Sequence, residues 1–164
     1  YLMANCQGKV LDIACGTGKT MQILSKYIDL DIYGIDISNL LLEQALARGI
    51  RPGRLKIGDA TKLDFAADSF DYGYSIGSLE HFTSQGIDEC IRECHRVVRA
   101  TSFHHVPVSR SQTDEGWITP NQSYFNNSEQ WWLKKFTAVY PQVYVLDSRW
   151  DDVISVGKWF ICRK

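Results

Sequence analysis

The hydrophobic and polar positions of the chain follow two different periods, and each change of period marks a new element. The run KVLDIAC (9–15) is apolar on both sides of a two-residue alternation, which is typical of a parallel strand covered on both faces. After a turn with two glycines, KTMQILSKYI places Met21, Leu24 and Ile28 at helical spacing, which predicts a helix. The chain therefore opens with a strand, a tight turn and a helix.

The alternation of strand and helix continues to residue 108. A helix is predicted over 39–49, with Ser38 or Asn39 as its N-cap and Gly49 at its end. Another is predicted over 85–99, because its apolar side chains gather on one face: Ile87, Cys90, Ile91, Cys94, Val97 and Val98. Strands are predicted at 32–38, 54–60, 70–77 and 102–108. This order indicates a doubly wound sheet of parallel strands with right-handed crossovers.

The last third of the chain follows a different pattern. A short helix is predicted over 127–136, and the apolar runs at 142–150 and 155–164 predict two strands with a short connection. Strands joined in this way pair antiparallel, and we expect them at the edge of the sheet. The predicted fold class is α/β, a doubly wound, mostly parallel seven-stranded sheet with an antiparallel C-terminal edge pair.

Length and composition indicate that residues 1–164 form a single domain. The 164 residues are 45% hydrophobic and 23% charged, which is ordinary for a globular domain with one core. A formal net charge of -1 with interspersed signs gives no positive surface of the kind that nucleic acids or anionic membranes require. No apolar run reaches the ~18 residues of a membrane-spanning helix. We therefore expect neither a nucleic acid nor a membrane as a partner.

The five cysteines are an odd number in a chain too large to need disulfides, so a reducing compartment is expected, with the cytoplasm as the default location. Cys90, Cys94 and His95 raise the question of a metal site. However, the two cysteines lie four residues apart on a predicted helix, His95 points elsewhere, and no second ligand pair is in view. Buried thiols are the preferred interpretation, and no metal is predicted.

The loop LDIACGTGKT (11–20) carries the first candidate chemistry. Its Gly-Lys-Thr ending suggests a P-loop, but that motif needs a glycine five residues before Gly18, where Ile13 stands inside the strand. A dinucleotide-binding loop needs a third glycine at the place of Met21, whose side chain would separate helix from strand. Neither kind of phosphate site fits the spacing.

An acidic residue followed by small residues at alternate positions remains: Asp12, Ala14, Gly16 and Gly18. This pattern resembles the first motif of the class I S-adenosylmethionine-dependent methyltransferases, which surrounds the amino-acid half of the cofactor. That half carries no phosphate, so close approach of the backbone suffices and no anion-binding nest is needed. The resemblance implies S-adenosylmethionine as the cofactor.

The next strand ends follow the same family in order. GIDIS puts Asp36 where an acidic residue meets a ribose diol in both dinucleotide-binding and methyltransferase sheets, with Ile37 as a candidate wall for the adenine. GDA offers Asp59, which in the resembling family accepts from the adenine amino group, and the backbone of Ala60 beside it. Each of these residues also has an ordinary structural interpretation: Asp36 and Asp59 as turn residues, and Ile37 as core.

The fourth strand end gives the most specific match. FDYGYSIGSLEHF (70–82) matches the family's Phe-Asp, strand, Ser-x-Gly-x-Leu-Glu-His pattern. The resemblance implies that the backbones of Ser75 and Ile76 border the methionyl group. The resemblance covers residues 9–108 well, whereas the remainder matches the family only in its order of secondary-structure elements. Residues 1–108 are therefore expected to form a cofactor-binding half, and 109–164 an acceptor-side segment with the terminal strand pair.

The resemblance implies methyl transfer to a small-molecule acceptor by direct displacement, which depends mainly on positioning the nucleophile. His81 is the candidate base, because it follows the fourth strand on the loop that faces the methyl group in the resembling fold. A capping or packing imidazole is the alternative. His104 and His105 have opposite side-chain directions on a strand, and burial with a hydrogen-bond partner is the preferred interpretation for each.

The aromatic residues after the fifth predicted strand allow two interpretations: Trp117, Tyr124, Phe125, Trp131 and Trp132. They form either the rim of an apolar acceptor site or a cover for the sheet. Two other functions stay open for the whole chain. One is a non-catalytic S-adenosylmethionine-binding or regulatory protein, and the other, less favoured, is an NAD-dependent dehydrogenase that tolerates Met21. The pattern predicts no oligomeric state.

Two departures from the family pattern give further expectations. The family carries a helical segment before its first strand that helps to close the cofactor pocket, whereas only residues 1–8 precede the strand here. Either this segment is missing from the chain, which is the preferred interpretation, or the pocket is unusually open. The predicted helix ending RVVR also runs into ATSFHHV without a glycine or proline. Because a helix that reverses into a parallel strand needs linking residues, several residues are expected to be missing between about Arg99 and Ser102.

Overall fold

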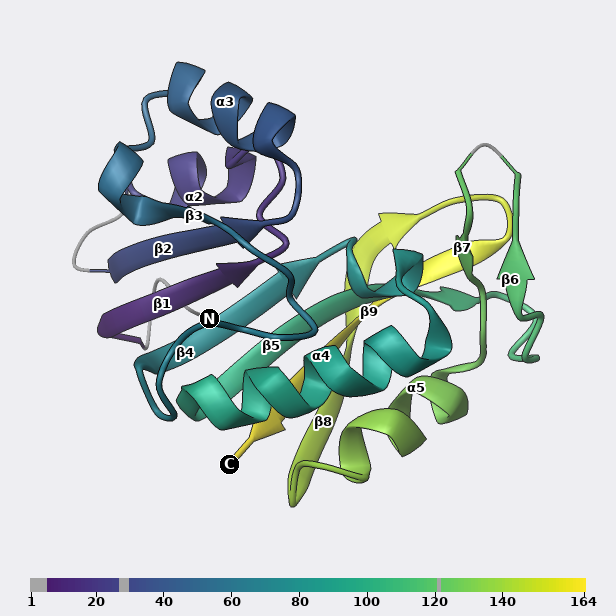
Figure 1. Ribbon diagram of the computed structural model, residues 1–164. Helices are drawn as coiled ribbons and strands as arrows, with labels where there is room; N and C mark the ends of the chain where they lie inside the picture. The colour runs from purple at the N-terminus through teal and green to yellow at the C-terminus, as the bar shows by residue number, and fades with distance from the viewer. Residues whose placement is uncertain (1–5, 27–29, 121) are drawn as a thin grey trace.

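The computed structural model describes residues 6–26, 30–120 and 122–164, and its centre is a seven-stranded sheet of order β3-β2-β1-β4-β5-β9-β8 (Figure 1). Neighbours from β3 to β5 pair in parallel, whereas β9 runs antiparallel to both β5 and β8. The strands are β1 (Gly8–Ile13), β2 (Leu30–Asp36), β3 (Leu55–Ile57), β4 (Phe70–Ile76), β5 (Val98–Ser109), β8 (Gln142–Asp151) and β9 (Ser155–Arg163). The predicted fold class is confirmed.

The four predicted helices are present with shorter bounds. They are α2 (Lys19–Leu24), α3 (Asn39–Ala47), α4 (Ser84–Val97) and α5 (Glu129–Thr137), and two short 3-10 helices were not predicted: η1 (Pro52–Arg54) and η2 (Leu79–His81). Ser38 caps α3 as expected, because its Oγ accepts a hydrogen bond from the Leu41 N–H at 3.3 Å. Ile28, a position of the first predicted helix, lies outside the described residues. None of the described helices is long and apolar enough to cross a membrane.

Each face of the sheet has its own apolar core. On one face, α4 and α5 lie against the strands (Figure 1), and the predicted apolar face of α4 is fully buried there together with Leu11, Val106 and Phe160. On the other face, Met21 of α2 packs with Val10 and other side chains of the sheet. Because each fully buried large apolar side chain contributes roughly 1.5–3 kcal/mol, the two cores fix the strands whose ends form the site.

The junction between α4 and β5 differs from the prediction of a helix through residue 99. The helix ends at Val97 and the strand begins at Val98 without a connecting loop. The register of the neighbouring strand shifts at this point, since Phe70 pairs with Val98 but Tyr72 pairs with Thr101. The one-residue excess in β5 is a bulge, which bends a strand locally. That residues are missing here stays a prediction.

A small second sheet was not expected from the sequence. It consists of β6 (Trp117–Ile118) and β7 (Tyr124–Phe125), which pair antiparallel. In Figure 1 this hairpin stands apart from the main sheet, above α5 and beside the connection between β8 and β9. Strands of two residues carry too little pattern to be recognised in a sequence.

The loop between β1 and α2 owes its shape to three residues with positive φ angles: Ala14 (55°), Gly16 (53°) and Gly18 (67°). A side chain at Gly18 would place its Cβ 2.9 Å from Ala45 Cβ of α3, whereas one at Gly16 would meet nothing within 4 Å. The two glycines therefore have different reasons to be present. The absence of a side chain at Gly18 lets α3 approach the loop, whereas the space beside Gly16 is open.

Gly18→Ala is expected to lower the free energy of unfolding by about 2–4 kcal/mol, and Gly16→Ala by only about 1 kcal/mol. Both variants place a Cβ in the left-handed region, which costs an L-residue roughly 1–2 kcal/mol and is offset in part by a less flexible unfolded chain. Only Gly18→Ala adds the overpacking cost of about 1–3 kcal/mol. Urea denaturation of the two variants measures the difference, and equal losses would contradict the packing role of Gly18.

Candidate functional site

The loop after β1 and the end of β2 are joined through one carboxylate. The Gly16 N–H donates to Asp36 Oδ2 at 2.8 Å, and the Ser38 N–H donates to Asp36 Oδ1 at 2.9 Å. Asp36 is buried and stands at the carboxyl end of its strand. It thus holds the first loop and the start of α3 in fixed positions, in addition to any ligand that it meets.

Three apolar side chains are exposed at the carboxyl ends of β2, β3 and β4. Ile37 follows β2 and is 71% exposed, Ile57 ends β3 at 57%, and Ile76 ends β4 at 40%. The interpretation of Ile37 as a core residue is therefore wrong. Exposed isoleucines at the carboxyl edge of a parallel sheet lie where open α/β folds bind ligands, and the sequence patterns did not single out Ile57.

Asp59 and Ala60 form a turn after β3. Asp59 Oδ1 accepts hydrogen bonds from the Thr61 N–H at 2.8 Å and from the Thr61 hydroxyl at 2.7 Å. The carboxylate is exposed, and the Ala60 side chain is buried. The turn interpretation of Asp59 is thus present in the structure, and its exposed carboxylate remains accessible from the sheet edge.

Asp12 is a buried carboxyl group at the end of β1. Tyr74 Oη donates a hydrogen bond to Asp12 Oδ2 at 2.8 Å. Burial raises the pKa of Asp12 to about 8, the tyrosine hydrogen bond acts against this rise, and the negative charge of Asp36 adds to it. Among the described residues no lysine, arginine or histidine forms an ion pair with Asp12. The ionised form of Asp12 therefore has no cation of the described chain to stabilise it.

Ser75 and His104 turn their side chains away from this edge. Ser75 Oγ and His104 Nδ1 are 2.8 Å apart inside the protein, and His104 stacks on Phe136. Burial lowers the pKa of His104 to about 3, so the imidazole is neutral. The expected burial of His104 with a hydrogen-bond partner is confirmed, and the Ser75 side chain is that partner.

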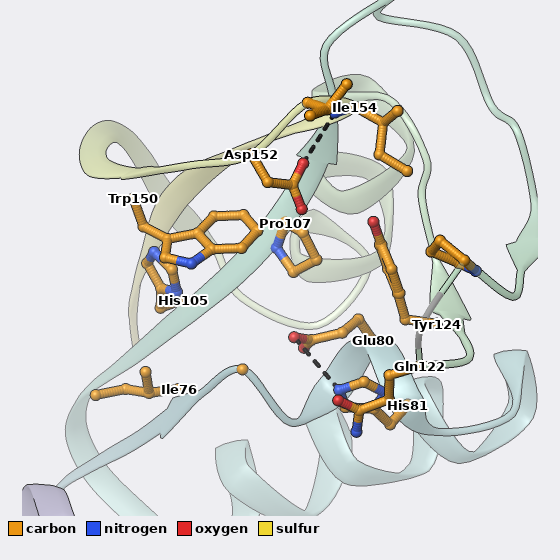
Figure 2. A pocket seen from close by; sticks show the side chains of 13 residues that line it. Ile76, Glu80, His81, His105, Pro107, Gln122, Tyr124, Trp150, Asp152 and Ile154 are labelled. Atoms are coloured by element: carbon orange, nitrogen blue, oxygen red, sulfur yellow. Dashed lines mark hydrogen bonds and ion pairs between the residues drawn. The ribbon is translucent and has the colours of Figure 1, made fainter.

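A cavity of about 580 Å³ begins at the end of β4 (Figure 2). One side is formed by residues from β4, η2 and β5: Ile76, Gly77, Glu80, His81, His105 and Pro107. The other side comes from the β6–β7 hairpin and the β8–β9 connection: Pro120, Gln122, Tyr124, Trp150, Asp152, Val153 and Ile154. Its volume is within the range of small-molecule sites.

Two titratable residues of η2 meet at the wall of this cavity. His81 Nδ1 lies 2.7 Å from the carbonyl oxygen of Ser123, which can only accept, so Nδ1 donates and Nε2 of the neutral ring is unprotonated. Nε2 lies 3.9 Å from Glu80 Oε1. Burial raises the pKa of Glu80 to about 7. The arrangement gives an oriented imidazole with a free nitrogen next to a buried carboxyl group.

The aromatic segment divides between the two expected roles. Tyr124 lines the cavity, whereas Trp132 is fully buried in the core next to α4. Trp117 and Phe125 stack edge to face in the hairpin, and Phe125 stacks on Trp131. Tyr124 is thus the member of this aromatic set that lines the cavity, and Trp132 is the one in the core.

Several cavity residues were not singled out from the sequence as site candidates. His105 lines the cavity and has its Nε2 2.9 Å from Ser148 Oγ, with a pKa lowered by burial. Trp150 and Asp152 come from the end of β8 and the turn after it. Glu80 was present in the quoted Leu-Glu-His pattern, which is the one signal that pointed to it. Nothing local in the sequence marks Trp150 or Asp152.

Comparison with known proteins assigns a family. Residues 10–101 match the family described as "Methyltransferase domain". A demethylmenaquinone methyltransferase of Thermotoga maritima is 37% identical over 92 residues, covering 56% of this chain and 39% of that protein. An O-methyltransferase of Pyrenophora dematioidea is 36% identical over 117 residues, covering 68% of this chain and 42% of that protein. The chain thus spans about two fifths of the length of these relatives.

The fold agrees with a solved structure over nearly the whole chain. A structure described as a SAM-dependent methyltransferase from Methanosarcina mazei has a TM-score of 0.76 and 19% identity, and the match covers 96% of this chain and 92% of that one. The resemblance inferred from the four strand ends is confirmed, since the family match spans more than half of the chain. This chain belongs to the methyltransferase-domain family and has the fold of the class I S-adenosylmethionine-dependent methyltransferases.

Proposed function

We propose that this chain transfers the methyl group of S-adenosylmethionine to a small-molecule acceptor held in the cavity beside η2. The observation that carries the proposal is the position of that cavity, which begins at Ile76 and Gly77 on the same sheet edge as Asp12 and Asp36. A cofactor lying along the strand ends would therefore reach the acceptor site. Because the similar protein of Pyrenophora dematioidea is an O-methyltransferase, a hydroxyl oxygen is the first nucleophile to test.

The residues of the first loop fit the cofactor. Open space faces Gly16, where a Cβ would meet nothing within 4 Å, so a ligand can lie against its backbone. Ala14 and Gly18 contribute through the shape of the loop. Asp36 uses each carboxylate oxygen for one backbone N–H, and because a carboxylate has about four acceptor positions, it keeps positions free for ribose hydroxyls.

The remaining strand ends supply apolar walls and a polar edge for the adenine. Ile37 and Ile57 expose their side chains at the ends of β2 and β3, which suits the flat faces of a base. Asp59 and the backbone of Ala60 follow β3 and would bind the adenine amino group and ring. The backbones of Ser75 and Ile76 at the end of β4 would border the methionyl part.

Asp12 fits the positive charge of the cofactor. Its carboxyl group is buried, and burial raises its pKa. No lysine, arginine or histidine of the described chain forms an ion pair with it. The amino group or sulfonium of S-adenosylmethionine would supply that charge at the end of β1. A buried carboxylate that gains a cation recovers much of its desolvation cost, so Asp12 favours a cationic ligand over a neutral one.

His81 is suited to take the acceptor's proton. When bound, S-adenosylmethionine supplies an electrophilic methyl group and leaves as S-adenosylhomocysteine. His81 lines the cavity, and because its Nδ1 donates to the Ser123 carbonyl, Nε2 is the nitrogen that lacks a proton in the neutral ring. As the acceptor oxygen takes the methyl group, its proton passes to Nε2. Glu80, 3.9 Å away, would then stabilise the resulting imidazolium.

The structure favours this function over the two alternatives. A non-catalytic binding protein would be expected to have its acceptor position filled by side chains, whereas a cavity of about 580 Å³ stands there. A dinucleotide-binding loop would need close contact between helix and strand at the place of Met21. Met21 Sδ instead occupies the space over Gly34, 2.6 Å from where a Cβ would stand.

Calorimetric titration with S-adenosylmethionine, S-adenosylhomocysteine, NAD and ATP tests the cofactor. We expect binding of the first two only, and at least a tenfold loss of affinity, about 1.4 kcal/mol, in Gly16→Ala because the new methyl group occupies the ligand's space. Gly49→Ala is the matched control, since Gly49 also has a positive φ (92°) and open surroundings but lies just after the C-cap of α3. No response to the two sulfur compounds would refute the proposal.

Asp12→Asn is expected to make the stability of the ligand-free protein less dependent on pH. The folded state keeps the Asp12 proton up to about pH 8, while the unfolded state releases it near the ordinary aspartate pKa of 3.8. Because the folded state binds more protons in between, the free energy of unfolding falls as pH rises, by up to about 1.4 kcal/mol per pH unit. Urea denaturation between about pH 5 and 8 should show a smaller slope in Asp12→Asn.

Asp64→Asn controls for the loss of an aspartate charge. Asp64 is exposed and its pKa is lowered by Lys56, so it is already ionised in both states within this range. The slope in Asp64→Asn should equal that of the unchanged protein. An unchanged slope in Asp12→Asn as well would mean that Asp12 is ionised in the folded protein at these pH values.

His81→Gln is expected to lower kcat by about 10²–10⁴-fold through loss of the proton acceptor, with the affinity for S-adenosylhomocysteine retained. The comparison is His95→Gln, because His95 lies on α4 against Tyr140, remote from the cavity lining. Steady-state methylation rates and calorimetric titration provide the two measurements. A kcat equal to that of His95→Gln would assign His81 to packing rather than to proton transfer.

A further inference from the structure

Glu80 carries an unsatisfied oxygen at the wall of the cavity. The residue is only 5% exposed, and its Oε2 is buried without a hydrogen-bond partner in the described part of the chain. Figure 2 shows its carboxyl group directed into the cavity, between Pro107 and Ile76. A buried acceptor without a donor costs about 1–3 kcal/mol, and more when charged. Because Oε2 itself is closed off, Oε1 on the side of His81 is the oxygen that a donor on a ligand in the cavity can reach.

A second acceptor stands beside it. His81 Nε2 has no proton in the neutral ring, because Nδ1 donates to the Ser123 carbonyl, and it lies 3.9 Å from Glu80 Oε1. Two acceptors so close together, on consecutive residues of one short helix, match a ligand that presents two donors side by side. A ligand with one donor would leave one of them unpaired.

The other residues that line the cavity suit a flat, uncharged ligand. Trp150, Tyr124 and Pro107 present ring surfaces to the cavity (Figure 2). The charged side chains of the described lining are carboxylates, Glu80 and Asp152, and no lysine or arginine is among them. An anionic acceptor would therefore be repelled and would find no cation to pair with.

We propose that the acceptor is an uncharged aromatic ring with two hydrogen-bond donors on adjacent carbons, at least one of them a hydroxyl. The reacting hydroxyl meets His81 Nε2, and its neighbour donates to Glu80 Oε1, the carboxyl oxygen that lies 3.9 Å from Nε2. This inference rests on the proposed methyl transfer and names the substrate class of the same cavity. Glu80 acts as a specificity residue, since it contacts the group that is not methylated.

Three rings that differ in one substituent test the inference: catechol, phenol and salicylate. The expected kcat/KM for catechol exceeds that for phenol by about ten- to a hundredfold, the ratio that one hydrogen bond to a charged group gives. Salicylate replaces the second donor by a carboxylate, and its expected turnover is below that of phenol. Titration of the same rings into the S-adenosylhomocysteine complex should give the same order of affinities.

Variants at Glu80 assign the preference to its carboxyl group. Glu80→Leu should bring the ratio of catechol to phenol within about twofold of unity, because the oxygen that accepts the second donor is gone. Glu80→Gln keeps an acceptor oxygen and should retain part of the preference. Asp152→Asn is the control for the other carboxylate of the wall, and it should leave the ratio unchanged because Asp152 Oδ1, which accepts from Ile154 and Ser155, is preserved.

The outcomes separate this inference from the proposed function. Loss of the ratio in Glu80→Leu, with thermal unfolding as cooperative as in the unchanged protein, supports the inference. Equal turnover of catechol and phenol, faster turnover of salicylate, or an unchanged ratio in Glu80→Leu would overturn it. Cofactor binding without methylation of any ring would overturn the inference alone, whereas absence of cofactor binding would overturn the proposed function.

Discussion

The carboxylate of Asp36 is the contact on which the rest of the site depends. It accepts the backbone N–H groups of Gly16 and Ser38, and so joins the loop after β1 to the start of α3. The N–H of Cys15 adds a bond to the Ile35 carbonyl at 2.9 Å, which continues the pairing of β1 and β2 beyond the strand end. These bonds hold a loop with three positive φ angles in one conformation, and the open space beside Gly16 depends on that conformation.

The site also contains two carboxyl groups that reduce the stability of the folded protein. Asp12 ends β1 and Glu80 follows β4, and burial raises the pKa of both, to about 8 and about 7. Such groups are costly to keep and are concentrated at functional sites. Different partners would stabilise the two carboxyl groups, because Asp12 lacks a cation and Glu80 lacks a hydrogen-bond donor. One arrangement suits a positively charged cofactor and the other an uncharged acceptor with hydroxyl groups.

The sheet edge and the cavity were predictable to different degrees. The strand-end residues Asp12, Asp36 and Asp59 could be located from the sequence, since each follows a strand whose pattern is local. Within the aromatic segment, the sequence could not tell that Tyr124 faces the cavity while Trp132 is in the core. Both lie among similar residues, and their surroundings come from elements far away in the chain.

The seven main strands, the four helices and the glycine turn at Gly16 and Gly18 could be predicted from the sequence, because periodicity and the spacing of small residues are local properties. The cavity shared by Glu80, His105 and Trp150 could not be predicted in this way, since η2, β5 and the end of β8 are brought together by sheet pairing across long sequence separations. The same holds for the direct passage of α4 into β5, where a bulge opposite Phe70 takes the place of a loop. Pairing of distant strands depends on the whole core, and no short stretch of sequence contains that information.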